Sequence, residues 1–250
     1  MIRLLVDIGN TRLKWTRSRD DTLAPIAAHA LDDALDDALA SAWLGEVDDV
    51  WIASVASPAR TASVVAAARR AWPQAPIEVP ATPAQACGVF NAYEEPARLG
   101  IDRFLALIAA RARGEGPALV ASLGTALAID GLARAGLHLG GLIAPSPDLM
   151  RNAVLGATAR TASRGTPEIA DFGRSTQACL TSGSWLAAAA LVERAAARLA
   201  AKVAEPVRVL IAGGGAPALS PLLGIEHELA PALVLEGLAR FAHSEKARVR

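Results

Sequence analysis

The sequence predicts an α/β protein made of two similar halves, and three observations lead to this prediction. First, one motif occurs twice: an apolar run ends in a small polar residue, and one spacer, a glycine and a polar residue follow, as in Asp7-Ile8-Gly9-Asn10 and Ser122-Leu123-Gly124-Thr125. Second, segments of strand character alternate with segments of helical periodicity. Third, the Gly-Glu-Gly-Pro cluster at 114–117 interrupts the pattern, which then starts again. We therefore expect an N-terminal half at 1–115 and a C-terminal half at 116–250.

The first half opens on a sheet that is rich in hairpins. Its predicted strands are 2–8, 12–18, 22–28 and 50–55. Its predicted helices are 31–42, 58–72 with a cap near Ser57, and 101–113. In the first of these helices, the Leu-Asp-Asp-Ala repeat at 31–38 places carboxylates on one face, which is typical of a solvated helix surface.

The second half repeats this order of elements. Its predicted strands are 118–122, 125–132, 137–144 and 207–212. Its predicted helices lie near 147–157, 175–203 and 231–243.

Composition favours a compact protein that acts on small molecules. The 25 basic side chains balance the 25 acidic ones, so the chain lacks the basic excess of a nucleic-acid or membrane-surface binder. Cys87 and Cys179 form no disulfide framework, and Asp7 comes too early for a signal-peptide core, so we expect a cytoplasmic protein. The longest uncharged run, 209–225, is broken by glycines and prolines, which argues against a membrane span. The 4 histidines show no spacing typical of zinc ligands.

Each copy of the motif is a candidate phosphate loop. A glycine in a tight strand-turn-strand hairpin permits backbone torsions that let successive N–H groups converge on an anion, and Asp7 could hold a divalent cation beside it. One copy alone fits an ordinary Asn-Thr hairpin turn better than a phosphate loop, whereas two copies favour phosphate binding. A Walker A sequence is absent, which disfavours a P-loop kinase.

Repeated hairpin openings of this kind resemble the duplicated ribonuclease-H-like fold of the actin, hexokinase and acetate-kinase superfamily, in which nucleotide binds in the cleft between the halves. Seven segments, in order along nearly the whole chain, resemble one family more narrowly: the type III pantothenate kinases of coenzyme A biosynthesis. These segments are 7–14, 91–93, 99–103, 123–126 with Asp130, 138–145, 175–176 and 211–214.

The resemblance implies an ATP- and Mg²⁺-dependent homodimer that phosphorylates pantothenate, with roles for particular residues. Asp102 would accept the proton of the substrate hydroxyl, and Asp7 would lie near Mg²⁺ that is held by the phosphates. The implied ATP-binding residues are Asp7, Ile8, Gly9, Asn10, Thr11, Arg12, Leu13, Lys14 and Thr125. The implied pantothenate-binding residues are Tyr93, Gly100, Ile101, Asp102, Arg103 and Thr176.

Several of these residues also have purely structural interpretations. Asp102 suits the positive end of a helix dipole, and Arg103 could pair with Glu95. Either Ser175 or Thr176 could be the N-cap of a long helix. The glycines at 213–215 could admit adenine or ribose against the backbone, although a glycine cluster alone is a weak signal.

Ser122 departs from the family pattern. The family usually has an Asp at this position, which is implied to bind an activating monovalent cation such as K⁺ or NH₄⁺. A serine offers a neutral oxygen in place of the carboxylate, so a cation would lose its main charge partner. We therefore expect weak or absent activation by K⁺.

Three other functions remain open at this level. A kinase of the same superfamily for another small hydroxyl substrate would keep both phosphate loops but lack the set of Tyr93, Asp102 and Thr176. A non-catalytic regulator would bind a partner or nucleotide without turnover, and Ser122 could mark its drift from catalysis. A plain interaction module would have no use for two phosphate loops.

Overall fold

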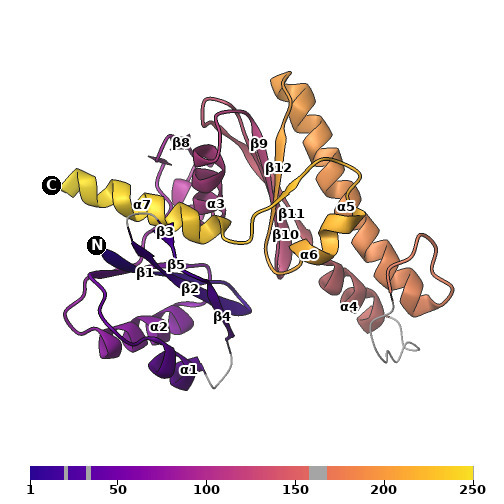
Figure 1. The fold of residues 1–250 in the computed structure, drawn as a ribbon. Coiled ribbons are helices and arrows are strands. Elements are labelled where there is room, and N and C mark those ends of the chain that lie inside the picture. The colour runs from indigo at the N-terminus through magenta and orange to yellow at the C-terminus, as the bar shows by residue number, and fades with distance from the viewer. Residues whose placement is uncertain (20–21, 32–34, 158–167, 250) are drawn as a thin grey trace. The chain divides into compact units, whose positions relative to one another are not determined.

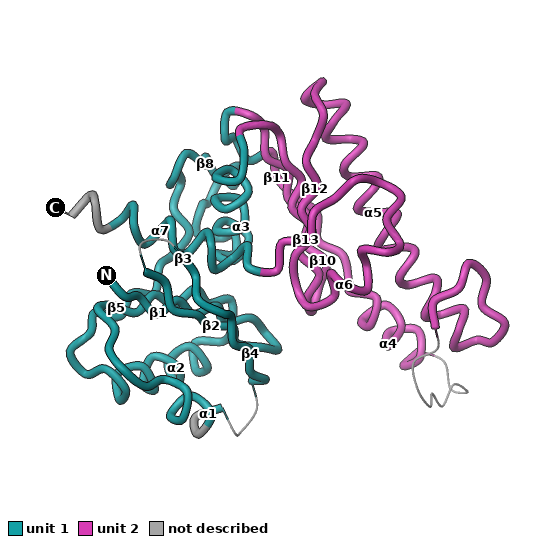
Figure 2. The backbone as a smooth tube through the Cα atoms, in the orientation of Figure 1, with its two compact units in different colours: residues 1–114, 135–138, 232–250 teal, residues 115–134, 139–231 magenta. Residues whose placement is uncertain are grey.

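The computed structural model describes residues 1–19, 22–31, 35–157 and 168–249. These residues form two compact units, of which the first contains 1–114, 135–138 and 232–250 and the second contains 115–134 and 139–231 (Figure 2). The sequence places the division at 115/116. The structure groups two later segments, 135–138 and 232–250, with the first unit because they pack against its elements.

The sheet of the first unit contains the predicted hairpin as its first two strands. Its strands are β1 (Ile2–Ile8), β2 (Arg12–Arg19), β3 (Thr22–Leu23), β4 (Ala27–Ala30), β5 (Asp49–Ser54) and β6 (Ile77–Glu78). Their order is β3-β2-β1-β5-β6, with β4 paired to β2; β1 is antiparallel to β2 and parallel to β5. The strand predicted at 22–28 is interrupted in the structure. Pro25, which has no N–H to donate, lies in the gap between β3 and β4.

Helices cover both faces of this sheet (Figure 1). Because side chains alternate along a strand, Leu4, Val6 and Ile8 share one face, and they form a core with α1 (Leu35–Ala42) and α2 (Pro58–Ala71). On the other face, Phe241 of α7 (Leu233–Val249) meets Trp51 of β5 edge to face. The predicted cap of α2 is confirmed, since the Ser57 hydroxyl accepts a hydrogen bond from the Arg60 N–H.

Helix α3 (Ile101–Ala112) packs closely against α7. A Cβ at Gly237 of α7 would lie 1.9 Å from the carbonyl oxygen of Leu105, so only glycine permits this approach. The chain reaches α3 through β7 (Gln85–Ala86), β8 (Val89–Phe90) and η1 (Pro96–Arg98), none of which the sequence predicted. The turn between β7 and β8 contains Cys87 at a φ of 49° and Gly88 at 75°.

The second unit contains its own five-stranded sheet. Its strands are β9 (Ala118–Leu123), β10 (Ala126–Leu132), β11 (His138–Pro145), β12 (Arg208–Ala212) and β13 (Glu228–Leu229), in the order β11-β10-β9-β12-β13. The long helix α5 (Thr176–Val203) packs on one face through residues such as Ala188 and Val192, and α4 (Pro147–Ala157) packs on α5. Short helices α6 (Ala216–Leu219) and η2 (Ser220–Leu222) follow β12.

The two units share one plan. In each, the first two strands form an antiparallel hairpin, and a later strand joins the first one in parallel. The predicted hairpins at both motifs are therefore confirmed. The prediction that the acidic repeat at 31–38 forms a solvated face concerns residues 32–34 and side chains at 36 and 37, which lie outside the described residues.

Candidate active site

The first motif forms the turn between β1 and β2. The Gly9 N–H donates to the Arg12 carbonyl at 3.0 Å, which closes the turn, and Asn10, Thr11 and Arg12 are exposed. The expectation of unusual glycine torsions is wrong here, because neither Gly9 nor Gly124 has a positive φ. A Cβ at position 9 would lie 3.3 Å from the Arg12 carbonyl oxygen, a tight contact that a small shift of the turn would have to relieve.

Asp7 lies on the face of β1 that α7 covers. It points away from Val6 and Ile8, it is half-buried, and Lys14 of β2 stands directly opposite it. Burial, together with the nearby carboxylate of Asp102, raises the pKa of Asp7 to about 7, and Lys14 partly opposes this rise. The structure thus brings the first candidate phosphate loop and the predicted proton acceptor within electrostatic reach of each other.

Asp102 lies in the first turn of α3. One of its oxygens, Oδ1, accepts a hydrogen bond from the Arg103 N–H at 2.8 Å, so the structural interpretation of this residue as a helix-start carboxylate holds. A Cβ at Gly100 would lie 2.6 Å from this oxygen and 3.5 Å from Val55 Cγ1. Gly100 therefore permits the observed orientation of Asp102.

Tyr93 and Arg103 form a pair beside Asp102. Arg103 Nη1 donates to the Tyr93 hydroxyl at 3.1 Å, and its guanidinium carbon lies 5.8 Å from the centre of the ring. Upstream, the Asn91 side chain accepts from the Tyr93 N–H at 3.0 Å and fixes the local turn. Glu95, which the sequence offered as a partner for Arg103, pairs with Arg98 at 2.8 Å.

The remaining predicted residues belong to the second unit. Ser122 is half-buried in β9, between Ala128 of β10 and Ala212 of β12, and Thr125 is exposed at the turn that follows. Ser175 is the N-cap of α5, and its hydroxyl accepts from the Ala178 N–H at 3.2 Å. Thr176 is exposed at the first position of that helix.

The glycine cluster at 213–215 has a packing role that the sequence did not reveal. Gly213 has a φ of 89°, and a Cβ there would lie 2.3 Å from the Leu123 carbonyl oxygen. A Cβ at Gly215 would lie 2.6 Å from the Leu123 side chain. Two of the three glycines thus allow this turn to approach β9, and only at Gly214 does the space around a Cβ stay open.

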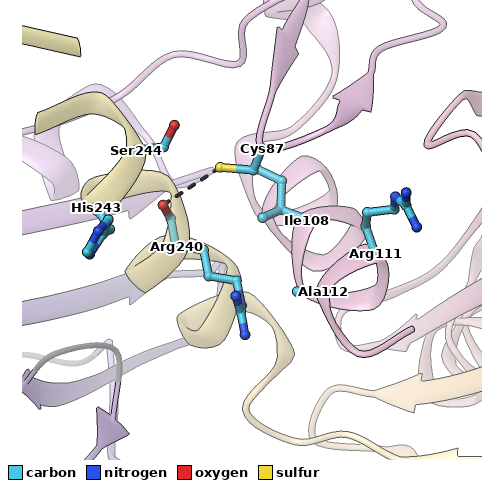
Figure 3. A pocket seen from close by; sticks show the side chains of 7 residues that line it. All are labelled: Cys87, Ile108, Arg111, Ala112, Arg240, His243 and Ser244. Carbon is cyan, nitrogen blue, oxygen red and sulfur yellow. Dashed lines mark hydrogen bonds between the residues drawn. The ribbon is translucent and has the colours of Figure 1, made fainter. Parts of the chain in front are cut away.

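A pocket of about 490 Å³ lies elsewhere in the first unit, and none of the predicted site residues lines it. Its lining residues are Cys87, Ile108, Arg111, Ala112, Arg240, His243 and Ser244. The Cys87 thiol donates to the Arg240 carbonyl at 3.7 Å, whereas the Arg111, Arg240 and His243 side chains point in different directions (Figure 3). The basic groups therefore do not converge on one anion.

Comparison with known proteins identifies the family. Residues 3–198 match the family model described as type III pantothenate kinase. The type III pantothenate kinase of Xanthomonas euvesicatoria pv. vesicatoria is 40% identical over 242 residues, which are 97% of this chain and 98% of that protein. The enzyme of the same name from Xanthomonas campestris pv. campestris strain B100 is 43% identical over 247 residues, with coverage of 97% and 98%. This chain belongs to the type III pantothenate kinase family.

Solved structures confirm the predicted fold class for this member of the pantothenate kinase family. A Baf family protein from Campylobacter jejuni matches with a TM-score of 0.59 and 17% identity, over 98% of this chain and 99% of that one. MreB 5 of Spiroplasma citri matches with a TM-score of 0.51 and 11% identity, over 99% and 98%. A glucokinase from an Antarctic psychrotroph matches with a TM-score of 0.50 and 12% identity, over 97% and 99%. At such low identities these matches show the duplicated ribonuclease-H-like fold alone.

Two features are absent from the described part of the chain. No helix there is long and apolar enough to cross a membrane. Nor do three or more His, Cys, Asp or Glu side chains gather there as a metal-binding group.

Proposed function

We propose that this protein transfers the γ-phosphoryl group of ATP to pantothenate and so forms 4′-phosphopantothenate, the first step of coenzyme A biosynthesis. The observation that carries this proposal is the placement of Asp102 of α3 beside both Asp7 of the phosphate loop and the Tyr93–Arg103 pair. Membership of the pantothenate kinase family supports pantothenate as the acceptor.

The turn after β1 is proposed to hold the phosphates. Asn10, Thr11 and Arg12 are exposed there, and Lys14 carries a positive charge on the neighbouring strand. Phosphoryl transfer needs mainly positioning and neutralisation of charge, and backbone N–H groups, a hydroxyl and a cationic side chain can supply both. Ile8, Gly9 and Leu13 shape the turn, and Thr125 of the second motif is proposed as a further ATP contact.

The charges around Asp7 fit a magnesium ion. Mg²⁺ is commonly held by one or two carboxylates together with substrate phosphates, and here the carboxyl group of Asp7 has a raised pKa because burial and Asp102 disfavour its charge. A divalent cation would relieve that repulsion. When bound, Mg²⁺ would neutralise charge on the transferring phosphoryl group, and Asp7 would hold it through the phosphates.

Asp102 is proposed as the proton acceptor. The hydroxyl oxygen of pantothenate attacks the γ-phosphorus, the bond to the oxygen that bridges to the β-phosphorus breaks, and ADP leaves. The hydroxyl proton passes to the carboxylate of Asp102, whose Oδ1 also accepts the Arg103 N–H. Arg103 and Tyr93 carry donors suited to the carboxylate and amide oxygens of pantothenate.

The remaining assignments complete this proposal. Gly100 and Ile101 line the pantothenate site at the start of α3, and Thr176 contributes its exposed hydroxyl. The active form is proposed to be a cytoplasmic homodimer. Ser122 replaces the usual carboxylate, so the monovalent-cation site is proposed to be weak or lost.

Release of ADP by the purified protein with ATP and Mg²⁺ tests the function. Turnover that requires pantothenate, and that disappears in Asp102→Asn but persists in the surface control Asp148→Asn, would support the kinase. Asp148 is suitable as a control because its side chain is 75% exposed. Turnover with a different hydroxyl compound would favour another kinase of the superfamily. Nucleotide binding without any turnover would favour a regulator and overturn the proposal.

A further inference from the structure

His138 is a buried residue that the roles above leave unused. It lies at the start of β11, and only 1% of its surface is exposed. The segment 135–138 packs with the first unit because it is tied to β8: the Phe90 N–H donates to the Gly136 carbonyl at 2.9 Å, and Phe90 forms a β-bridge with Leu137. This attachment places His138 beside the loop that carries Tyr93.

Two contacts join His138 to that loop. The imidazole and phenol rings are stacked, with centroids 6.2 Å apart and planes 16° from parallel. The Ala92 N–H donates to His138 Nδ1 in a long hydrogen bond of 3.4 Å. Because a backbone N–H can only donate, Nδ1 is the acceptor in this contact.

The contacts continue from Tyr93 to the reacting centre. The Tyr93 hydroxyl accepts from Arg103 Nη1 at 3.1 Å, and the backbone N–H of Arg103 donates to Asp102 Oδ1 at 2.8 Å. His138 thus supports a ring whose hydroxyl orients a guanidinium next to the proposed proton acceptor. His138 therefore touches this loop at two points, the ring face of Tyr93 and the N–H of Ala92, whereas the Tyr93 N–H is held separately by Asn91.

We propose that His138 is a positioning residue for pantothenate, which acts by holding the ring plane of Tyr93 and, through the Tyr93 hydroxyl, the guanidinium of Arg103. This role rests on the proposed function, in which Tyr93 and Arg103 contact pantothenate. His138 reaches no proposed ATP residue through these contacts, so its effect falls on the binding of pantothenate and leaves the binding of ATP unchanged. No sequence argument assigned His138 a role, since its spacing fits no metal site.

Steady-state kinetics of three variants test this role. His138→Ala removes the stacked ring, and it should raise the KM for pantothenate about five- to tenfold, the range expected for one aromatic pair, with kcat within about twofold. His138→Phe keeps a flat ring and should return the KM to within about twofold of the original value. The control His227→Ala removes a histidine of the second unit that bonds Ser220, and it should leave all constants unchanged. The KM for ATP should stay constant in all three.

Tyr93 also provides a direct readout, because it is the only tyrosine in the chain. Fluorotyrosine incorporation gives a single ¹⁹F resonance, which should move in His138→Ala, where the stacked ring is lost, and stay near its original position in His138→Phe. An unmoved resonance in folded His138→Ala, an unchanged KM for pantothenate in that variant, or a higher KM in folded His138→Phe would each overturn the role of His138.

A separate measurement distinguishes failure of the proposed function from failure of the role of His138. Saturation with pantothenate should shift the resonance of the unmodified protein. If it does not, the assignment of Tyr93 to the substrate site is wrong, and the inference drawn from it falls, even though the variants would still report the stack itself.

Discussion

The raised pKa of Asp7 predicts how stability depends on pH. An Asp whose pKa is about 7 in the folded chain and 3.8 in the unfolded chain holds its proton more tightly when folded. It therefore stabilises the fold fully below pH 3.8, and this contribution is lost as the pH rises through 7. The substitution Asp7→Asn removes the titration, since an amide stays neutral at every pH.

The size of the effect follows from the two pKa values. Each pKa unit corresponds to about 1.4 kcal/mol, so the full difference amounts to roughly 4 kcal/mol of unfolding free energy. About 2 to 3 kcal/mol of this should be lost between pH 5 and pH 8, where the folded chain is easiest to study. Relative to Asp7→Asn, the original protein should lose that amount across this range when metal ions are absent.

Urea denaturation in EDTA at pH 5, 6, 7 and 8 measures the difference. Titrating groups that do not interact with Asp7 are common to both proteins, so they cancel in the comparison. Glu78→Gln is a matched control because Glu78 is an exposed carboxylate of the same unit, on β6, and its curve should run parallel to that of the original protein. A free-energy difference between the original protein and Asp7→Asn that stays constant from pH 5 to pH 8 would refute the account of Asp7. In activity assays, Asp7→Asn should lower turnover about 10- to 100-fold, because it weakens the hold on Mg²⁺.

Three further predictions concern other parts of the molecule. Asp102→Asn should lower kcat about 10²- to 10⁴-fold while nucleotide binding persists, measured by ADP release and by a fluorescent nucleotide; near-normal kcat would rule out its role as proton acceptor. Activity should change little between K⁺ and Na⁺ buffers, and Ser122→Asp should introduce a preference for K⁺; strong K⁺ dependence of the original protein would contradict this view of Ser122. Gly237→Ala should lower the unfolding free energy by about 1 to 3 kcal/mol or more, because the new Cβ would meet the Leu105 carbonyl; unchanged urea curves would mean that the two helices separate without cost.

The regular elements could be predicted from the sequence because their signals are local. Alternating apolar residues placed the strands of both hairpins, and Ser57 marked the start of α2. The two-residue strands β6 and β13 carry no such pattern, since they exist only through pairing with β5 and β12. The packing of α7 on the first unit could not be predicted from local sequence patterns either. It depends on the close approach of Gly237 to Leu105, which is far away in the sequence.

The candidate site was predicted in part. The doubled motif pointed to Asp7 from the residues themselves, whereas Tyr93, Asp102 and Arg103 entered through the family resemblance. Their arrangement depends on tertiary contacts that no local pattern encodes, such as the stacking of His138 on Tyr93. The segment 138–145 carried part of the family resemblance, but nothing in its residues assigned a role to His138.

The close packing of α3 on α7 has a consequence for how the chain folds as it is synthesised. Residues 101–112 of α3 emerge early from the ribosome, but their partner helix at 233–249 emerges only after the whole second unit has been made. The second unit can complete its sheet and bury α5 before α7 emerges. Until then, part of the apolar surface of α3 stays exposed to solvent. Asp102, the proposed proton acceptor at the start of α3, therefore belongs to the part of the protein that folds last. A ribosome that stalls between the two helices would release a chain with a folded second unit and an incomplete candidate active site.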